Sequence, residues 1–422
     1  MANTAELVRG LYEFWRAAPL WAPVGVAATI AGFWFGRRFQ RATRKATITD
    51  IDAPGPRAHE LVLQRKLDEA RAREANDNRL REAVLSDESE LWQLYEAKPP
   101  SRNVLLAKVS RPKIIVVANN KGGVGKTTLT AGLATFFEKR LKQRVLLIDL
   151  DYQGSLTNWM IKATGTHIPP DQSHRLALAN ALVDGSAREH WATETLRNTR
   201  GADGLVNAQL ITADYSLTRH ENKLMLGWLV QGGNPDIRFH IAEALLGPHV
   251  QDNTKGFDVV IIDAPPRLTV GVVGALIAAT HLVVPTILDP LSAETVGSFL
   301  KQAWTWRTKF NPGLDLAGVV ATMTTARAAG KPLTGAELDA RGIVLSAMKE
   351  WGADAYMFNS EIQDLAAIRK RAGLSNPYFD DDERAARMFD AFGQELCQRI
   401  EALHSIDDSS VKRSAVRSGT RR

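Results

Sequence analysis

One stretch between residues 113 and 141 restricts the fold of this chain more than any other part of it. Residues 113–118 (KIIVVA) are apolar and mostly β-branched, which is typical of a strand buried on both faces. The strand leads directly into a glycine-rich loop, residues 119–128 (NNKGGVGKTT), and a helical pattern follows at once. Glycines let backbone N–H groups turn inward around phosphate oxygens, and a helix N-terminus adds positive charge. Strand, loop and helix in this order predict an α/β fold with a phosphate-binding loop.

The residue types of this loop indicate what it binds. Lys126 would reach the β- and γ-phosphates of a nucleotide, and the hydroxyl of Thr127 would ligate Mg²⁺. We expect Thr128 at the α-phosphate. The backbone that would cradle the phosphates belongs to Gly122, Gly123, Val124 and Gly125.

Two further apolar strands end in carboxylates. Residues 144–151 (RVLLIDLD) carry Asp149 and Asp151, and residues 257–263 (FDVVIID) end in Asp263. Any one of these aspartates alone could be a helix cap or an ordinary loop residue. Ligands bind at the carboxyl ends of parallel strands, so aspartates at several strand ends favour a common site near the phosphate loop.

The loop departs from the common pattern G-x-x-x-x-G-K-T, because Asn120 stands at the first glycine and Lys121 follows it. Its KGGVGKTT segment resembles the deviant P-loop family that includes ParA and MinD, whose loop it matches residue for residue. The resemblance implies a Mg-ATP site in an ATP-dependent homodimer. Lys121 would cross the nucleotide sandwich and stabilise the γ-phosphate bound to the other subunit, so that slow hydrolysis to ADP and phosphate waits for dimerisation.

The same resemblance implies roles for the three aspartates. The family has D-x-D-P-Q-G where this chain has residues 149–154 (DLDYQG), with Tyr152 in place of the proline. Asp151 would position or activate the attacking water, and Asp149 would support the Mg²⁺ shell. Asp263, followed by Ala-Pro-Pro, matches the Walker-B carboxylate and would hold Mg²⁺ through water.

Further strands extend the resemblance to about residues 110–404. They are expected at residues 209–214, 282–287, 317–323 and 357–362. Met323 lies in a TMTTAR segment that resembles the family's adenine-contacting region, although the aspartate often found there is missing. We therefore predict a doubly wound, mostly parallel sheet flanked by helices, within an ATPase domain at residues 106–404.

The N-terminal part of the chain carries a membrane signal. Residues 17–36 contain no charge, span about 30 Å as a helix, and have tryptophans near both ends. Five bases and no acid follow in residues 37–45, which places the N-terminal segment 1–16 outside and the rest in the cytoplasm. A cleaved signal peptide would carry its charges before the apolar stretch. We favour a transmembrane helix in a bacterial inner membrane over an interfacial helix or a buried core helix.

Residues 37–105 form a basic juxtamembrane segment followed by a charged helical pattern. Their thin apolar stripe favours a solvated spacer helix, with a short coiled coil or a partner-docking helix as the alternative. Residues 405–422 are rich in serine and bases, which predicts a disordered tail. The formal charge is +6, but five bases lie in each of these two basic segments, so the charge does not indicate a basic globular domain. The single Cys397 excludes a disulfide framework and a cysteine-held iron–sulfur cluster within one chain.

Two functions from different classes fit these features. The first is a membrane-anchored, ParA-like ATPase switch for partition or positioning of DNA or a cargo complex, with an activating partner protein. Its non-specific DNA patch would include Arg327, Arg369, Lys370 and Arg371, which fit a solvated helix face equally well. The second is a DNA-independent recruitment or assembly ATPase for an envelope machine. A membrane-linked tyrosine kinase is disfavoured, because the tail contains no tyrosine.

Overall fold

The computed structural model describes residues 56–85, 88–99, 112–187, 192–197, 204–246, 256–324, 333–351, 355–365 and 382–419. It divides the chain into two compact units, residues 1–96 and 97–422. The expected membrane segment 17–36 and the four bases of the expected DNA patch lie outside the described residues. Among the helices that are described, none is long and apolar enough to cross a membrane.

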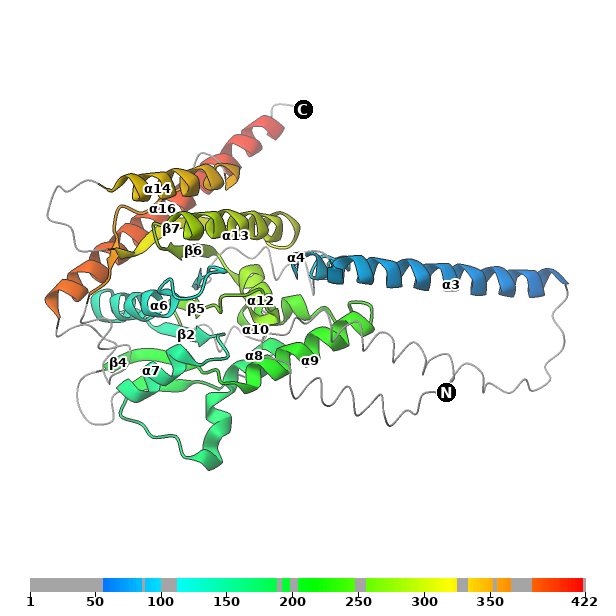
Figure 1. The fold of residues 1–422 in the computed structure, drawn as a ribbon, viewed down its shortest axis with the longest axis horizontal. Coiled ribbons are helices and arrows are strands. Elements are labelled where there is room, and N and C mark those ends of the chain that lie inside the picture. Colours follow the sequence, from blue (N-terminus) through cyan, green and yellow to red (C-terminus); the bar gives the residue numbers. More distant parts are fainter. Residues whose placement is uncertain are drawn as a thin grey trace. The chain divides into compact units, whose positions relative to one another are not determined.

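The described part of the first unit is helical. Helix α3 spans Pro56–Leu85 and the short helix α4 spans Glu88–Leu91 (Figure 1). Pro56 occupies the first helical position, where its missing N–H costs no hydrogen bond. Leu61, Leu63 and Leu67 of α3 are exposed, as expected for a largely charged helix with a thin apolar stripe.

The second unit is built on one sheet. Its described strands, which are numbered in chain order, occur in the spatial order β3-β4-β2-β5-β1-β6-β7-β8. They span Lys113–Val117 (β1), Val145–Asp149 (β2), Glu194–Arg197 (β3), Gly204–Ile211 (β4), Val259–Asp263 (β5), His281–Thr286 (β6), Asp315–Thr324 (β7) and Ile362–Gln363 (β8). All neighbours pair in parallel except β3, which runs antiparallel to β4. The doubly wound, mostly parallel sheet expected from the sequence is therefore confirmed.

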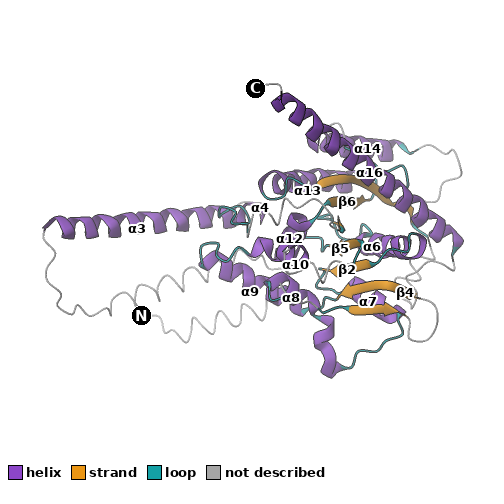
Figure 2. Cartoon of the chain, turned by 180° about the vertical axis from the view of Figure 1, so that it is seen from behind, coloured by secondary structure: helices purple, strands orange, loops and turns teal. Residues whose placement is uncertain are grey.

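Helices cover both faces of this sheet (Figure 2). The described helices are α6 (Lys126–Thr135), α7 (Ser155–Ala163), α8 (Leu178–Asp184), α9 (Ser216–Val230), α10 (His240–Leu246), α12 (Val270–Ala278), α13 (Pro290–Lys309), α14 (Gly335–Ala347) and α16 (Glu383–Gly419). A π-helical turn, Phe136–Arg140 (η2), extends α6. Three 3₁₀ turns span Pro170–Leu176, Ile237–Phe239 and Met348–Trp351.

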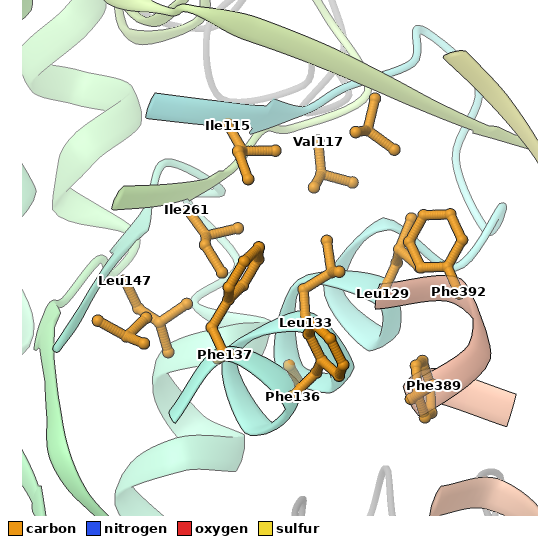
Figure 3. Close-up of a cluster of buried hydrophobic side chains, with 14 of the residues drawn as sticks. Ile115, Val117, Leu129, Leu133, Phe136, Phe137, Leu147, Ile261, Phe389 and Phe392 are labelled. Carbon is orange, nitrogen blue, oxygen red and sulfur yellow. The ribbon is translucent and has the colours of Figure 1, made fainter. Parts of the chain in front are cut away.

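One face of the sheet carries the core that Figure 3 shows. There α6 packs against β1 and β5, α7 against β2, η2 against β4, and α16 against β7 and β8. Phe136, Phe137, Phe389 and Phe392 belong to this core. Helices α12 and α13 lie against the opposite face, and α8, α9, α10 and α14 pack on these two. Because both faces are covered, the central strands are apolar throughout rather than alternating.

Three features differ from the expectations of the sequence. The strand expected at residues 357–362 is reduced to a bridge between Met357 and Val319 and to the two-residue strand β8. The short edge strand β3 was not expected, because its sequence (ETLR) has none of the apolar run that marks the central strands. The backbone is helical through Gly419, over most of the segment 405–422 for which a disordered tail was expected. Residues 405–418 contain no proline or glycine, so nothing in their sequence stops a helix that is anchored by the buried face of α16.

Candidate functional site

The glycine-rich loop follows β1 at the carboxyl edge of the sheet and ends at the first turn of α6. Gly125 is the N-cap of α6 and has a φ of +80°, a backbone conformation that residues other than glycine rarely adopt. On the far side of the loop, the hydroxyl of Thr322 donates to the carbonyls of Val124 (2.8 Å) and Thr286 (3.0 Å). The loop is thus tied to both β6 and β7.

Lys126 lies inside this loop rather than at the surface. Its side chain is only 7% exposed, and its Nζ donates to the carbonyl of Lys121 at 2.9 Å. Burial lowers the pKa of Lys126, and the carboxylates of Asp263 and Asp151 partly offset that effect. The ammonium group is therefore held across the loop, where it would meet the phosphates predicted from the sequence.

Thr127 and Asp263 meet directly below the loop. The Thr127 hydroxyl donates to Asp263 Oδ2 at 2.7 Å, although the two residues come from different strand–loop units. The other carboxylate oxygen, Asp263 Oδ1, is buried and has no hydrogen-bond partner among the described residues. A hydroxyl and an unpaired carboxylate oxygen are hard oxygen donors of the kind that Mg²⁺ binds, directly or through water. These residues therefore fit the Mg²⁺ site that the sequence predicts.

The electrostatics of this pair also fit a cation. Burial raises the pKa of Asp263 well above its ordinary value, the nearby Asp149 raises it further, and the hydrogen bond from Thr127 opposes both. A divalent cation would favour the ionised carboxylate. Within the described residues, no three acidic, histidine or cysteine side chains gather to hold a metal alone. A Mg²⁺ here would accordingly need phosphate oxygens and water, as it does beside a nucleotide, so ATP and Mg²⁺ are the cofactors for which this site is built.

Asp149 is fully buried and supports the loop that follows β2. Its Oδ1 accepts from the amide of Asp151 at 3.0 Å, and its Oδ2 accepts from the amide and hydroxyl of Thr157 at 2.9 and 2.8 Å. Burial raises the pKa of Asp149 to about 7, against the opposing effect of these hydrogen bonds. Both oxygens are thus occupied by donors of this chain. Asp149 lies beside Asp263 in the register of β2 and β5, and its contribution to a Mg²⁺ shell stays a prediction.

Lys121 points away from the phosphate loop of its own chain. Its Nζ donates to the Ser292 hydroxyl at 2.6 Å and lies 3.6 Å from Asp289 Oδ1. Asp289 is the N-cap of α13 and accepts from both the amide and the hydroxyl of Ser292. Burial acts to raise the pKa of Asp289, but the bonds from Ser292 and the Lys121 ammonium together lower it. The sequence predicted Lys121 but not these partners, although Asp-Pro before a helical pattern is a cap signal.

Met323 also lies at the carboxyl edge of the sheet. It is 45% exposed and has a φ of +53°. This left-handed backbone conformation is rare for residues other than glycine, asparagine or aspartate. The register between β7 and β8 shifts at this residue, so its side chain leaves the alternation of the strand. Residues with such strained backbone cluster at ligand sites. This agrees with the prediction that Met323 lies near an adenine, which stays a prediction.

Parallel strands, a glycine loop with a buried lysine, and a Thr–Asp pair at the strand ends define a P-loop nucleoside triphosphatase. A family model described as an AAA domain matches residues 112–316. The chain is 32% identical over 224 residues to the chromosome-partitioning ATPase Soj of Thermus thermophilus, covering 53% of this chain and 73% of that protein. The chain therefore belongs to the ParA/Soj family of ATPases.

One further relative agrees with this assignment, and one solved structure shares the fold. The chromosome partitioning protein ParA of Caulobacter vibrioides is 30% identical over 215 residues, which cover 51% of this chain and 71% of that protein. The solved structure of apo McdA from Cyanothece shares the fold, with 20% identity and a TM-score of 0.51 over 68% of this chain and all of that one.

Proposed function

We propose that this chain is a membrane-anchored ParA-like ATPase. It binds Mg-ATP, forms a nucleotide-sandwich dimer and hydrolyses ATP as a switch for the partition or positioning of DNA or a cargo complex. The observation that carries the ATPase part is the convergence of Lys126, Thr127 and Asp263 under one glycine loop, with Asp263 Oδ1 left unpaired.

Each residue of the site has a place in this proposal. Mg²⁺, when bound, neutralises phosphate charge and polarises the γ-phosphate. Lys126 binds the β- and γ-phosphates from inside the loop, and Thr127 with Asp263 holds the cation. Asp151 orients the attacking water. Gly122, Gly123, Val124, Gly125 and Thr128 bind the phosphates through the loop and the first turn of α6.

The trans role of Lys121 is supported by where its side chain lies. Its Nζ is engaged by Ser292 and Asp289 and not by the phosphate loop, so it does not complete the site of its own chain. In the proposed dimer it leaves these partners and reaches the γ-phosphate bound to the second copy. Hydrolysis thereby depends on assembly, as a switch requires.

The cellular role rests on the family and on the sequence. Partition is what the names of Soj and ParA describe, and both relatives align over about half of this chain. The membrane anchor rests on the uncharged segment 17–36 and the five bases after it, and it places the ATPase on the cytoplasmic side of a bacterial inner membrane. An activating partner protein and non-specific DNA belong to the same proposal.

The experiment that tests the ATPase is a comparison of Lys126→Ala and Asp151→Ala. We expect Lys126→Ala to lower ATP affinity by about a hundredfold or more, because charge-assisted bonds to phosphate contribute about 1.5–3 kcal/mol each. Asp151→Ala should keep ATP affinity and lose turnover. Lys162→Ala removes an exposed lysine of α7 and serves as the matched control.

Calorimetric titration with Mg-ATP and a phosphate-release assay give the two readouts. Unchanged ATP affinity in Lys126→Ala would refute the nucleotide site, and normal turnover in Asp151→Ala would refute the assignment of the water-orienting carboxylate. Stimulation of wild-type turnover by duplex DNA separates partition from a DNA-independent recruitment ATPase.

A further inference from the structure

The loop that carries Asp151 makes a tight turn in which Tyr152 occupies the second position. The amide of Gly154 donates to the Asp151 carbonyl at 2.7 Å, and the amide of Gln153 donates to Asp151 Oδ1 at 3.0 Å. The second position of such a turn favours proline, whose ring fixes φ. A tyrosine at this position does not fix φ.

In this chain the ring of Tyr152 is held from outside the turn. The guanidinium carbon of Arg267 lies 4.9 Å from the centroid of the Tyr152 ring, which is the geometry of a cation–π contact. The ring also packs edge-on against Tyr215, with the two centroids 5.8 Å apart. Tyr152 is thus clamped between Arg267, which follows β5, and Tyr215, which precedes α9.

Arg267 is itself fixed by helix α9. Its Nη2 donates to the hydroxyl of Thr218 at 3.3 Å, and its charge acts on the buried carboxyl of Glu221. Glu221 Oε1 accepts from the amide of Gly271, in the first turn of α12, at 2.8 Å. The segment that follows β5 is therefore braced against α9 at Arg267 and again at Gly271.

We propose that Arg267 is a positioning residue for Asp151, acting by stacking on Tyr152, and that this contact replaces the stiffness a proline would give the turn. The inference rests on the proposed function of Asp151 and deepens it. It connects the loop of the water-orienting carboxylate to the loop of the Mg²⁺ carboxylate, because residues 263 and 267 belong to the same short segment. A change at one loop is thereby felt at the other.

We expect loss of the contact between Arg267 and Tyr152 to lower turnover without changing ATP binding. Neither Tyr152 nor Arg267 belongs to the phosphate loop, so their loss should leave the ATP affinity intact. Cation–π contacts contribute about 1–2 kcal/mol where partly buried, which corresponds to about a five- to thirtyfold fall in kcat when Asp151 is no longer held.

The test measures kcat and KM for ATP in the full chain with Mg²⁺. Arg267→Gln and Tyr152→Ser should each lower kcat by that factor at unchanged KM, while Tyr152→Phe, which keeps the ring, should restore it. Arg219→Gln removes an exposed arginine from α9 and is the matched control. The decisive variant is Tyr152→Pro, because a turn stiffened by proline no longer depends on the clamp. In that background, Arg267→Gln should have no further effect.

Four results would overturn the inference. If Arg267→Gln lowers kcat equally in the Tyr152→Pro background, Arg267 acts on the reaction by another route. If KM rises with kcat unchanged, the arginine contributes to binding. If Tyr152→Ser and Tyr152→Phe behave alike, the ring is not the contact, and this comparison decides even where Arg267→Gln fails to fold. Loss of turnover in Asp151→Ala, with normal turnover in Arg267→Gln, would refute this inference alone and leave the ATPase proposal standing.

Discussion

Three carboxyl groups around the candidate site are almost completely buried. Burial raises the pKa of Asp149 and Glu221 to about 7, and that of Asp263 well above its ordinary value. Asp149 accepts from the amide of Asp151, and Glu221 accepts from the amide of Gly271 in the first turn of α12. Asp263 keeps one oxygen without a partner among the described residues. The first two thus hold the loops in place, and the third is left to bind a ligand.

The raised pKa of Glu221 predicts a dependence of stability on pH. The unfolded chain releases the proton near the ordinary pKa of 4.5 and the folded chain near 7, so the folded state loses stability as pH rises through this window and no further above it. Glu221→Gln keeps an acceptor for the Gly271 amide and removes the titration. Urea unfolding should find this variant more stable than wild type at pH 8, by up to about 3 kcal/mol, and the difference should shrink toward pH 5. A difference that does not change with pH would contradict the burial argument.

At the scale of elements, helices α6 and α16 approach one another through glycines. A Cβ on Gly132 of α6 would lie 2.2 Å from the ring of Phe389, and a Cβ on Gly393 of α16 would lie 2.4 Å from the ring of Phe136. Real Cβ atoms do not come this close, so each glycine is required by the packing. Because α6 begins at the phosphate loop, this contact also fixes the position of that loop.

Gly132→Ala should therefore lower the free energy of unfolding by about 1–3 kcal/mol, the usual cost of overpacking a core. Gly342→Ala in α14 is the matched control, because a Cβ there meets nothing within 4 Å. That variant should gain about 0.5–1 kcal/mol from the better helix propensity of alanine. Denaturant unfolding of the two variants measures the difference, and equal effects in both would show that α6 and α16 are not closely packed.

The sequence predicts those elements that are marked by a pattern in their own residues. Strands β1, β2 and β5 are apolar runs, and the loop between β1 and α6 carries its own glycine pattern, so both were found. The edge strand β3 is polar and exists through its pairing with β4, which no local pattern reports. The same holds within the site. Lys121 and Asp151 are recognisable in the sequence, but their contacts to Ser292 and, through Tyr152, to Arg267 join segments that only the folded sheet brings together.

At the scale of the whole molecule, part of the positive charge lies next to the expected membrane segment. Five of the bases follow the uncharged segment 17–36, and they would be a topology signal if that segment is the proposed membrane span. We expect the full chain to sediment with membranes after a high-salt wash, and a chain without residues 1–46 to stay in the supernatant. Release of the full chain by salt alone would contradict a membrane span. The Lys126→Ala full chain is the control, since its membrane segment is intact.

The central claim is that Lys121 completes the ATP site of a second copy, and mixing two inactive variants tests it most directly. Lys121→Ala lacks the trans lysine and Asp151→Ala lacks the cis carboxylate, so each alone should hydrolyse little ATP. In a mixed dimer, the Lys121→Ala subunit keeps its own Asp151 and receives Lys121 from its partner, which makes one of the two sites complete. We predict that mixing restores turnover to a fraction of the wild-type rate. Mixed dimers that form with Mg-ATP in sedimentation but stay inactive would contradict the account.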